Sequence, residues 1–304
     1  MTITTITPQS REAWLAGRGV GFYPDMEADE YHADPCPQPS LSSSIAKLFI
    51  TATAKHAWLS HPRLNPNFTP DEDDKFDLGT VAHEYLLCSG AGYQVLKFDD
   101  WRTKDAKTAR DEARGQGKTP ILKANFDRVV TLCGIVRERL EGMKIDLTKN
   151  LNESVFIWQE RDAWCRSMLD SFDQRGGVIY DLKITGADLS DASLMRQIVN
   201  MGYDVSAAHY LRGVHAVMPE LQGRIRFRWI FAEASAPHEC RVIEASAMTM
   251  EIGARKDDFA IRRWQHCMAL DEWPGYAPEI TTLSLPTWAE SQWLERELQE
   301  AIHG

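Results

Sequence analysis

Two aspartates and a lysine lie around one polar break in the chain. Asp170 precedes the break, Asp181 and Lys183 follow it, and residues 174–177 between them read Gln-Arg-Gly-Gly. The apolar-rich runs on either side predict two antiparallel strands joined by a turn, a β-hairpin over residues 164–185. Because side chains alternate along a strand, Asp181 and Lys183 should share a face, and Asp170 could lie opposite them.

This grouping of charges suggests hydrolytic chemistry. Two carboxylates that meet at one point repel each other unless a cation joins them, and hard oxygen ligands suit Mg²⁺ or Mn²⁺. We therefore expect Asp170 and Asp181 to hold a metal ion, with the ammonium of Lys183 completing the set. An Asp-x-Lys triplet also arises by chance in a chain of this length, so an exposed ion pair on a surface hairpin is the alternative.

Length and composition limit the classes of protein that fit. The chain has 304 residues, and a hydrophobic content of 43% is enough for a sizeable core. It shows no long apolar run and no secretory leader, so we expect a soluble, cytosolic protein. Its six cysteines include no C-x-x-C pair, which argues against a zinc knuckle or an iron–sulfur cluster.

The net charge of −10 is unusual for a protein that binds nucleic acid, because phosphate binding depends on cations. The charge is unevenly distributed, with an acidic run at residues 71–74 and a locally basic segment at 102–123. The simplest interpretation of both runs is solvated surface.

Several predicted elements would position the hairpin. Prolines in residues 1–40 predict an irregular arm, and Ser40 to Ser44 offer N-caps for a helix that follows. We expect a single domain over residues 41–304. Its further elements are predicted from apolar periodicity and β-branched content as helices near 77–87, 121–140, 188–201 and 247–270, and strands at 153–159, 224–233 and 239–245.

The hairpin pattern, Asp170 followed by Asp181-Leu182-Lys183, resembles that of the PD-(D/E)XK nucleases. The segment Tyr31 to Leu59 resembles the opening segment of the RecE, or exonuclease VIII, family of phage recombination nucleases, and the similarity extends to about Trp288. The resemblance implies an α/β (α+β) fold with a restriction-endonuclease-like core, in which helices flank a central mixed β-sheet.

The resemblance also adds metal ligands. Residues 79–83 read Gly-Thr-Val-Ala-His, and in RecE-like and RecB-like nucleases a histidine in this glycine-led setting ligates the metal. His83 is therefore implied as a ligand, with Glu84 as the alternative if the helix phase differs. The backbone carbonyl of Leu182 is implied as a further ligand. Taken alone, a histidine within a helical pattern is more often a packing or surface residue.

Three residues are expected to contact the substrate. Arg166 lies four residues before Asp170 and is expected to grip a phosphate. Relatives carry a glutamine followed four residues later by a tyrosine. In this chain Ser206 takes the place of the glutamine and Tyr210 keeps the tyrosine. A serine reaches less far than a glutamine, and ordinary helix packing is the alternative for Tyr210.

The resemblance implies a Mg²⁺-dependent exonuclease in which Mn²⁺ can substitute. It would digest one strand of linear double-stranded DNA from the 5′ end and leave a 3′ overhang for a RecT-like single-strand annealing protein. Relatives assemble as homo-oligomeric rings that thread DNA. Two other functions fit the same residues: a non-catalytic protein that binds DNA ends, and a PD-(D/E)XK endonuclease.

Overall fold

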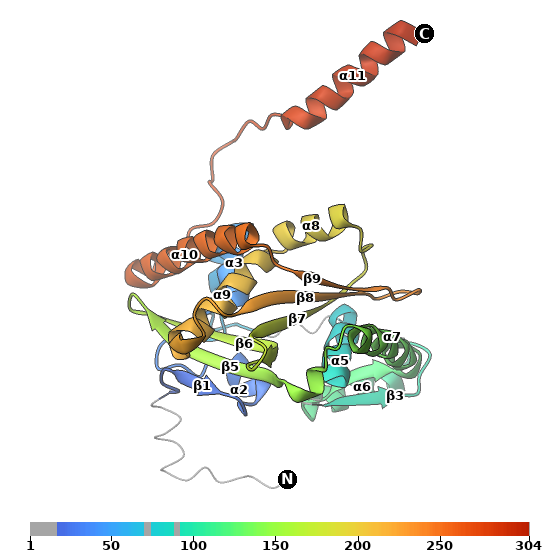
Figure 1. Cartoon of the computed structure of the whole chain (residues 1–304), viewed down its shortest axis with the longest axis vertical. Coiled ribbons are helices and arrows are strands. Elements are labelled where there is room, and N and C mark those ends of the chain that lie inside the picture. The colour runs from blue at the N-terminus through green and yellow to red at the C-terminus, as the bar shows by residue number, and fades with distance from the viewer. Residues whose placement is uncertain (1–16, 70–73, 88–91, 304) are drawn as a thin grey trace. The chain divides into compact units, whose positions relative to one another are not determined.

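The chain divides into two compact units, Met1–Pro274 and Gly275–Gly304. The computed structural model describes residues 17–69, 74–87 and 92–303 (Figure 1). None of the helices in this described part combines the length and the apolar character needed to cross a bilayer.

A mixed β-sheet is the centre of the first unit. Its strands follow the order β1-β5-β6-β7-β8-β9, and β2 pairs with β6. The β7–β8 and β2–β6 pairs are parallel, and the others are antiparallel. The strands are β1 (Gly21–Tyr23), β2 (Leu41–Ser42), β5 (Leu151–Glu160), β6 (Ala163–Asp173), β7 (Val178–Thr185), β8 (Arg226–Glu233) and β9 (Cys240–Glu244).

Helices surround this sheet, and β3 (Tyr93–Leu96) and β4 (Thr119–Leu122) form a separate parallel pair. The helices of the first unit are α2 (Ala28–His32), α3 (Ser43–Thr51), α4 (Ala54–Leu59), α5 (Asp74–Leu87), α6 (Lys104–Gly115), α7 (Lys123–Gly142), α8 (Asp191–Asn200), α9 (Tyr203–Val217) and α10 (Ala247–Leu270), with short 3₁₀ turns η1 (Leu147–Lys149) and η2 (Pro219–Leu221).

Local sequence explains where several helices begin. Ser42, Ser190 and Ser246 cap α3, α8 and α10, and each side-chain oxygen accepts a hydrogen bond from the backbone N–H three residues later. Gly202 separates α8 from α9 with a φ of 63°, a left-handed conformation that glycine adopts without strain. These polar signals account for the agreement between the predicted and observed helix starts.

Alternation along β7 directs its side chains into two different cores. On one side, α5 and α7 pack against the sheet in a cluster that contains Val178 and Leu182. On the other side, α8 and α9 cover a cluster that contains Ile179, Phe227 and Trp229. A third cluster joins α3, α4 and α10. The sheet is thus covered on both faces, which confirms the predicted mixed sheet flanked by helices.

Residues 17–40 are more than a lead-in. β1 pairs with β5, so that Gly21 lies opposite Ile157. Met26 and Tyr31 are buried against Val155 and Ile157. The predicted arm was wrong over these residues because their apolar side chains complete the sheet face at its edge, a long-range packing that local proline content does not reveal. Residues 1–16 of the predicted arm lie outside the described residues.

The second unit, Gly275–Gly304, contains helix α11 (Thr287–His303). Its large apolar residues Trp288, Trp293, Leu294 and Leu298 are exposed. The structure thus divides the predicted single domain over residues 41–304 after residue 274.

Candidate metal centre

The predicted hairpin is present, and its two strands separate at the predicted chemical residues. β6 and β7 pair from Asp173↔Val178 to Ser171↔Tyr180, and the ladder ends there. Beyond this point the backbone N–H of Leu182 donates to the Asp170 Oδ2 atom over 2.8 Å. The Asp170 carboxylate thus replaces the missing strand pairing and is held at the fork between the strands.

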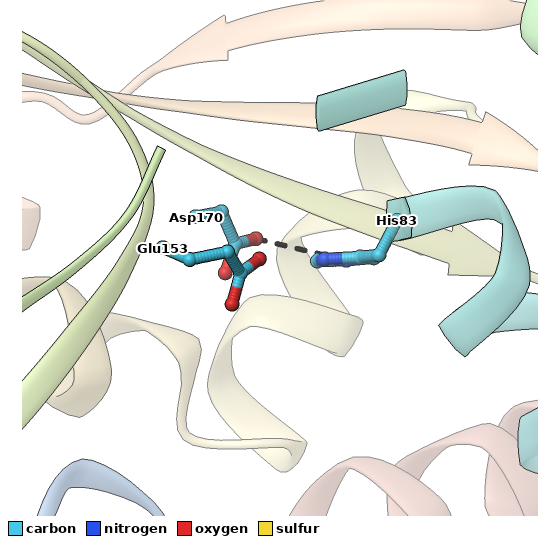
Figure 2. Close-up of side chains that lie close together, drawn as sticks. All are labelled: His83, Glu153 and Asp170. Atoms are coloured by element: carbon cyan, nitrogen blue, oxygen red, sulfur yellow. Dashed lines mark ion pairs between the residues drawn. The ribbon is translucent and has the colours of Figure 1, made fainter. Parts of the chain in front are cut away.

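His83 reaches the same point from α5. The buried neighbours Val81 and Ala82 anchor α5 in the cluster that contains the Leu182 side chain. The Nε2 atom of His83 lies 3.0 Å from the Leu182 carbonyl oxygen and 3.6 Å from the Asp170 Oδ2 atom (Figure 2). A ring nitrogen, a backbone carbonyl and a carboxylate oxygen therefore converge.

Glu153 is the third side chain of this group, and the sequence did not single it out. Ligand atoms of His83, Glu153 and Asp170 all lie within 4.8 Å of one another, and Figure 2 shows the two carboxylates beside each other, facing the histidine. Glu153 comes from β5 and occupies the register position opposite Asp170. We name these three residues the HED cluster.

The backbone at Glu153 departs from an ordinary strand. Its φ of 50° is left-handed, and the β5–β6 ladder is interrupted at the Glu153 and Asp170 positions. Side-chain alternation is reversed across this break, because Leu151 and Phe156, an odd number of positions apart, pack into the same cluster. A non-glycine residue in this conformation costs about 1–3 kcal/mol, and such strain is typical of functional sites.

Asp181 and Lys183 form an ion pair beside the HED cluster. The Lys183 Nζ atom lies 2.6 Å from the Asp181 Oδ2 atom and 3.3 Å from the Leu182 carbonyl oxygen. Asp181 is only 1% exposed. Burial and the neighbouring Asp170 carboxylate raise the Asp181 pKa, although Lys183 opposes the shift. Burial lowers the Lys183 pKa, but the attraction of Asp181 and Asp170 outweighs it and leaves the pKa raised.

Negative charge is in excess at the HED cluster. Burial raises the pKa of Glu153 to about 8, and repulsion from Asp170 and Glu84 adds to this effect. The nearby Lys183 is already paired with Asp181. Carboxylates held together in this way bind protons or a cation in compensation.

The donor atoms fit a divalent metal ion. They comprise carboxylate oxygens, one backbone carbonyl and one imidazole nitrogen. The ligand atoms of the three side chains lie within 4.8 Å of one another, which is close to the separation of opposite ligands around an ion with bonds of about 2.1–2.4 Å. Glu84 does not join them. Its Oε1 atom accepts a 2.7 Å hydrogen bond from the Gly92 backbone, and burial raises its pKa.

Comparison with known families agrees with this geometry. Residues 42–286 match the family described as a PDDEXK-like domain of unknown function, DUF3799. The chain belongs to this PDDEXK-like family. The predicted relation to PD-(D/E)XK nucleases is therefore confirmed, whereas the narrower similarity to RecE stays a prediction.

A solved structure shares the fold of this PDDEXK-like chain. A protein from Eubacterium rectale, assigned as a candidate exonuclease, has a TM-score of 0.61 at 15% identity, over 86% of this chain and 96% of that chain. A phage-related exonuclease from Haemophilus somnus has a TM-score of 0.33 at 10% identity, over 77% and 96%. Only the first is close enough to support the fold. A comparison with curated proteins found no match.

The PDDEXK-like core places Tyr210 near the site. Burial raises the Tyr210 pKa well above its ordinary value, and the carboxylates of Asp181 and Asp170 add to the shift. Its hydroxyl lies 3.4 Å from the Ser43 Oγ atom, while its ring packs 6.2 Å from the ring of Phe227. Tyr210 therefore combines helix packing with proximity to the predicted catalytic residues.

Ser206 is buried within the PDDEXK-like core and only 4% exposed. Its backbone N–H donates to the Gly202 carbonyl as part of the first turn of α9. A side chain this short and this deeply buried does not present itself to DNA. The structure thus argues against the predicted substrate contact at this position.

Arg166 corrects a prediction. It is 3% exposed, and its guanidinium donates to the carbonyl oxygens of Tyr31 and Ser40 and to the Ser40 hydroxyl. It also pairs with Asp34 at 3.2 Å. The predicted phosphate contact was wrong, because this guanidinium holds the N-terminal segment against β6.

Proposed function

We propose that this PDDEXK-like chain is a metal-dependent DNA nuclease that degrades linear double-stranded DNA. The observation that carries the proposal is the convergence of the HED cluster and the Leu182 carbonyl beside the Asp181–Lys183 pair. Mg²⁺ suits the oxygen-rich donors. Mn²⁺ prefers the same oxygen ligands and would also accept the single imidazole nitrogen. Asp181 would complete the ligand set from its position next to Asp170.

The residues would divide the work of phosphodiester hydrolysis. A divalent cation, when bound, stabilises charge on the phosphate and lowers the pKa of a coordinated water. Asp170 is held by the Leu182 N–H, so its carboxylate is oriented before substrate arrives. Lys183 has a raised pKa and is protonated, so it would neutralise phosphate charge and orient the water rather than act as a base.

We further propose an exonuclease that works from the 5′ end and leaves 3′ overhangs for a RecT-like annealing protein. Support for this finer assignment is the resemblance of residues 31–59 and of the hairpin to RecE. A homo-oligomeric ring around DNA belongs to the same proposal. It would explain how a chain with a net charge of −10 remains on its substrate, because topology replaces part of the electrostatic attraction.

Purified protein incubated with Mg²⁺ tests this function. The substrates are linear duplexes labelled at one 5′ end or one 3′ end, and closed circular DNA. We expect early release of the 5′ label, intact circles, and no reaction in EDTA.

Other outcomes would identify the competing functions. Early release of the 3′ label would refute the proposed polarity, and cutting of circles would make the protein an endonuclease. Bound ends without any loss of nucleotides would identify a non-catalytic end-binding protein.

A further inference from the structure

A second lysine lies beside the Asp181–Lys183 pair, and no motif in the sequence indicated it. Lys47 comes from α3, which packs beside α9 (Figure 1). The Lys47 Nζ atom lies 5.7 Å from the centroid of the Tyr203 ring on α9, and the Lys183 Nζ atom lies 5.2 Å from the same centroid. Two ammonium groups from distant parts of the chain thus meet at one aromatic ring.

The start of α9 leaves space for the Lys47 side chain. A Cβ atom added at Gly202 would lie 3.1 Å from Lys47 Cγ, closer than an ordinary contact. Gly202 therefore provides both the left-handed turn into α9 and room for the lysine stem. The neighbours Ile45 and Ala46 anchor α3 in the core, which fixes the direction of Lys47.

Lys47 differs from other partly buried lysines in its charged neighbours. Lys256, also partly buried, pairs with Asp204 at 2.5 Å, and Lys183 pairs with Asp181. Among the residues that the structure describes, no carboxylate lies within ion-pairing distance of Lys47. Burial lowers the Lys47 pKa, the nearby Lys183 lowers it further, and Asp181 offsets part of the shift. A partly buried cation beside another cation is unfavourable unless an anion joins them.

We propose that Lys47 is a substrate-binding residue that contacts a phosphate of the DNA strand being cleaved. The inference rests on the proposed function, because it is DNA bound at the HED cluster that would bring a phosphate to this position. Its stem is held by α3 and Gly202, and none of the carboxylates that the structure describes pairs with it. Its ammonium group lies near Lys183, at the catalytic end of β7. The DNA phosphate supplies the negative charge that pairs with the Lys47 ammonium group.

Three variants test this role: Lys47→Gln, Lys47→Arg and the control Lys55→Gln. Lys55 is exposed on α4, so its replacement removes the same charge from the surface. Binding to a short 5′-phosphorylated fluorescent duplex is measured with Ca²⁺, over a range of salt concentrations. We expect Lys47→Gln to weaken binding about tenfold and to reduce the slope of log K against log salt by about 0.9, the value for one phosphate contact. Lys47→Arg should restore most of the affinity.

Cleavage kinetics with Mg²⁺ give a second readout. Lys47→Gln should raise KM about tenfold while kcat changes by less than about threefold. An unchanged salt slope with a lower melting temperature would show that Lys47 is structural and overturn the inference. A loss confined to kcat would overturn it too, because Lys47 would then act through Lys183.

The binding measurement distinguishes a failure of this inference from a failure of the proposed function. If the wild-type protein binds the duplex without cleaving it, the nuclease assignment fails, while the salt slopes still decide the role of Lys47. If the wild-type protein cleaves DNA and Lys47→Gln matches Lys55→Gln in slope and KM, the inference alone fails.

Discussion

Replacing Glu153 by glutamine should stabilise the metal-free protein and impair the metal-bound enzyme. In the metal-free state, burial and neighbouring carboxylates hold the Glu153 pKa at about 8, against an ordinary value of 4.5. Between pH 4.5 and pH 8 the folded state therefore keeps a proton on Glu153 that the unfolded state has released. The stability that the protonated Glu153 side chain contributes is fully present below pH 4.5 and is lost as the pH rises through 8.

The magnitude follows from the size of the shift. At about 1.4 kcal/mol per pKa unit, ionising Glu153 destabilises the metal-free protein by about 4 kcal/mol at pH 8. Glutamine removes this charge but brings an amide whose imperfect hydrogen bonding costs about 1–2 kcal/mol. The net gain is about 2 kcal/mol, which raises the Tm of a domain of this size by roughly 4–8 °C.

Thermal unfolding in EDTA at pH 6 and pH 8 measures this effect. We expect Glu153→Gln to exceed the wild type in Tm at pH 8, with a smaller difference at pH 6. Added Mg²⁺ should stabilise the wild type and leave the variant nearly unchanged, because the variant lacks one anionic ligand. A variant that is less stable than the wild type at pH 8 in EDTA, or equally stabilised by Mg²⁺, would refute the role of Glu153.

Three further predictions concern stability and catalysis. His61 is held neutral because its Nδ1 atom accepts from the backbone N–H groups of Arg63 and Leu64, and burial lowers its pKa to about 4. The contribution of neutral His61 to stability is present above pH 6.5 and lost as the pH falls through 4. In urea unfolding, the free energy of unfolding should therefore fall by about 2 kcal/mol more for the wild type than for His61→Gln between pH 7 and pH 5; equal losses would contradict this. Arg166→Met should cost about 3 kcal/mol in urea unfolding, since buried Asp34 loses the nearer of its two arginine partners and keeps only Arg63, and the salt dependence of DNA binding should stay unchanged; a reduced salt slope in a stable variant would restore the phosphate role. Lys183→Ala should lower the cleavage rate at least about a hundredfold while circular dichroism remains native, and cleavage at the wild-type rate would remove Lys183 from the mechanism.

The sequence predicted elements whose signals are local. Ser42, Ser190 and Gly202 mark helix boundaries through hydrogen bonds and backbone conformation that depend on a few adjacent residues. The hairpin around Asp170 and Asp181 was predicted for the same reason, since strand alternation and a glycine turn are local properties. The implied contribution of His83 came from the resemblance, because nothing in a helical pattern distinguishes a ligand from a packing histidine.

The remaining features depend on contacts between distant residues. Arg166 was misassigned because its partners, Asp34 and Ser40, lie more than a hundred positions earlier in the chain. Lys47 reaches the site only because α3 packs beside α9, a contact that residue types do not reveal. The sequence does contain one signal for Glu153, a carboxylate next to the apolar residues of its predicted strand. Its left-handed backbone cannot be predicted from residue types.

Mg²⁺-dependent cleavage by Asp170→Asn tests the central claim most directly. This substitution keeps the shape of the side chain and its ability to accept from Leu182 N–H, while it removes one negative charge from the HED cluster. Release of nucleotides from a linear duplex is followed against Mg²⁺ concentration for the folded variant and the wild type. We predict saturable, EDTA-sensitive release by the wild type and none by the variant, and equal release by both proteins would contradict a metal-dependent active site at these residues.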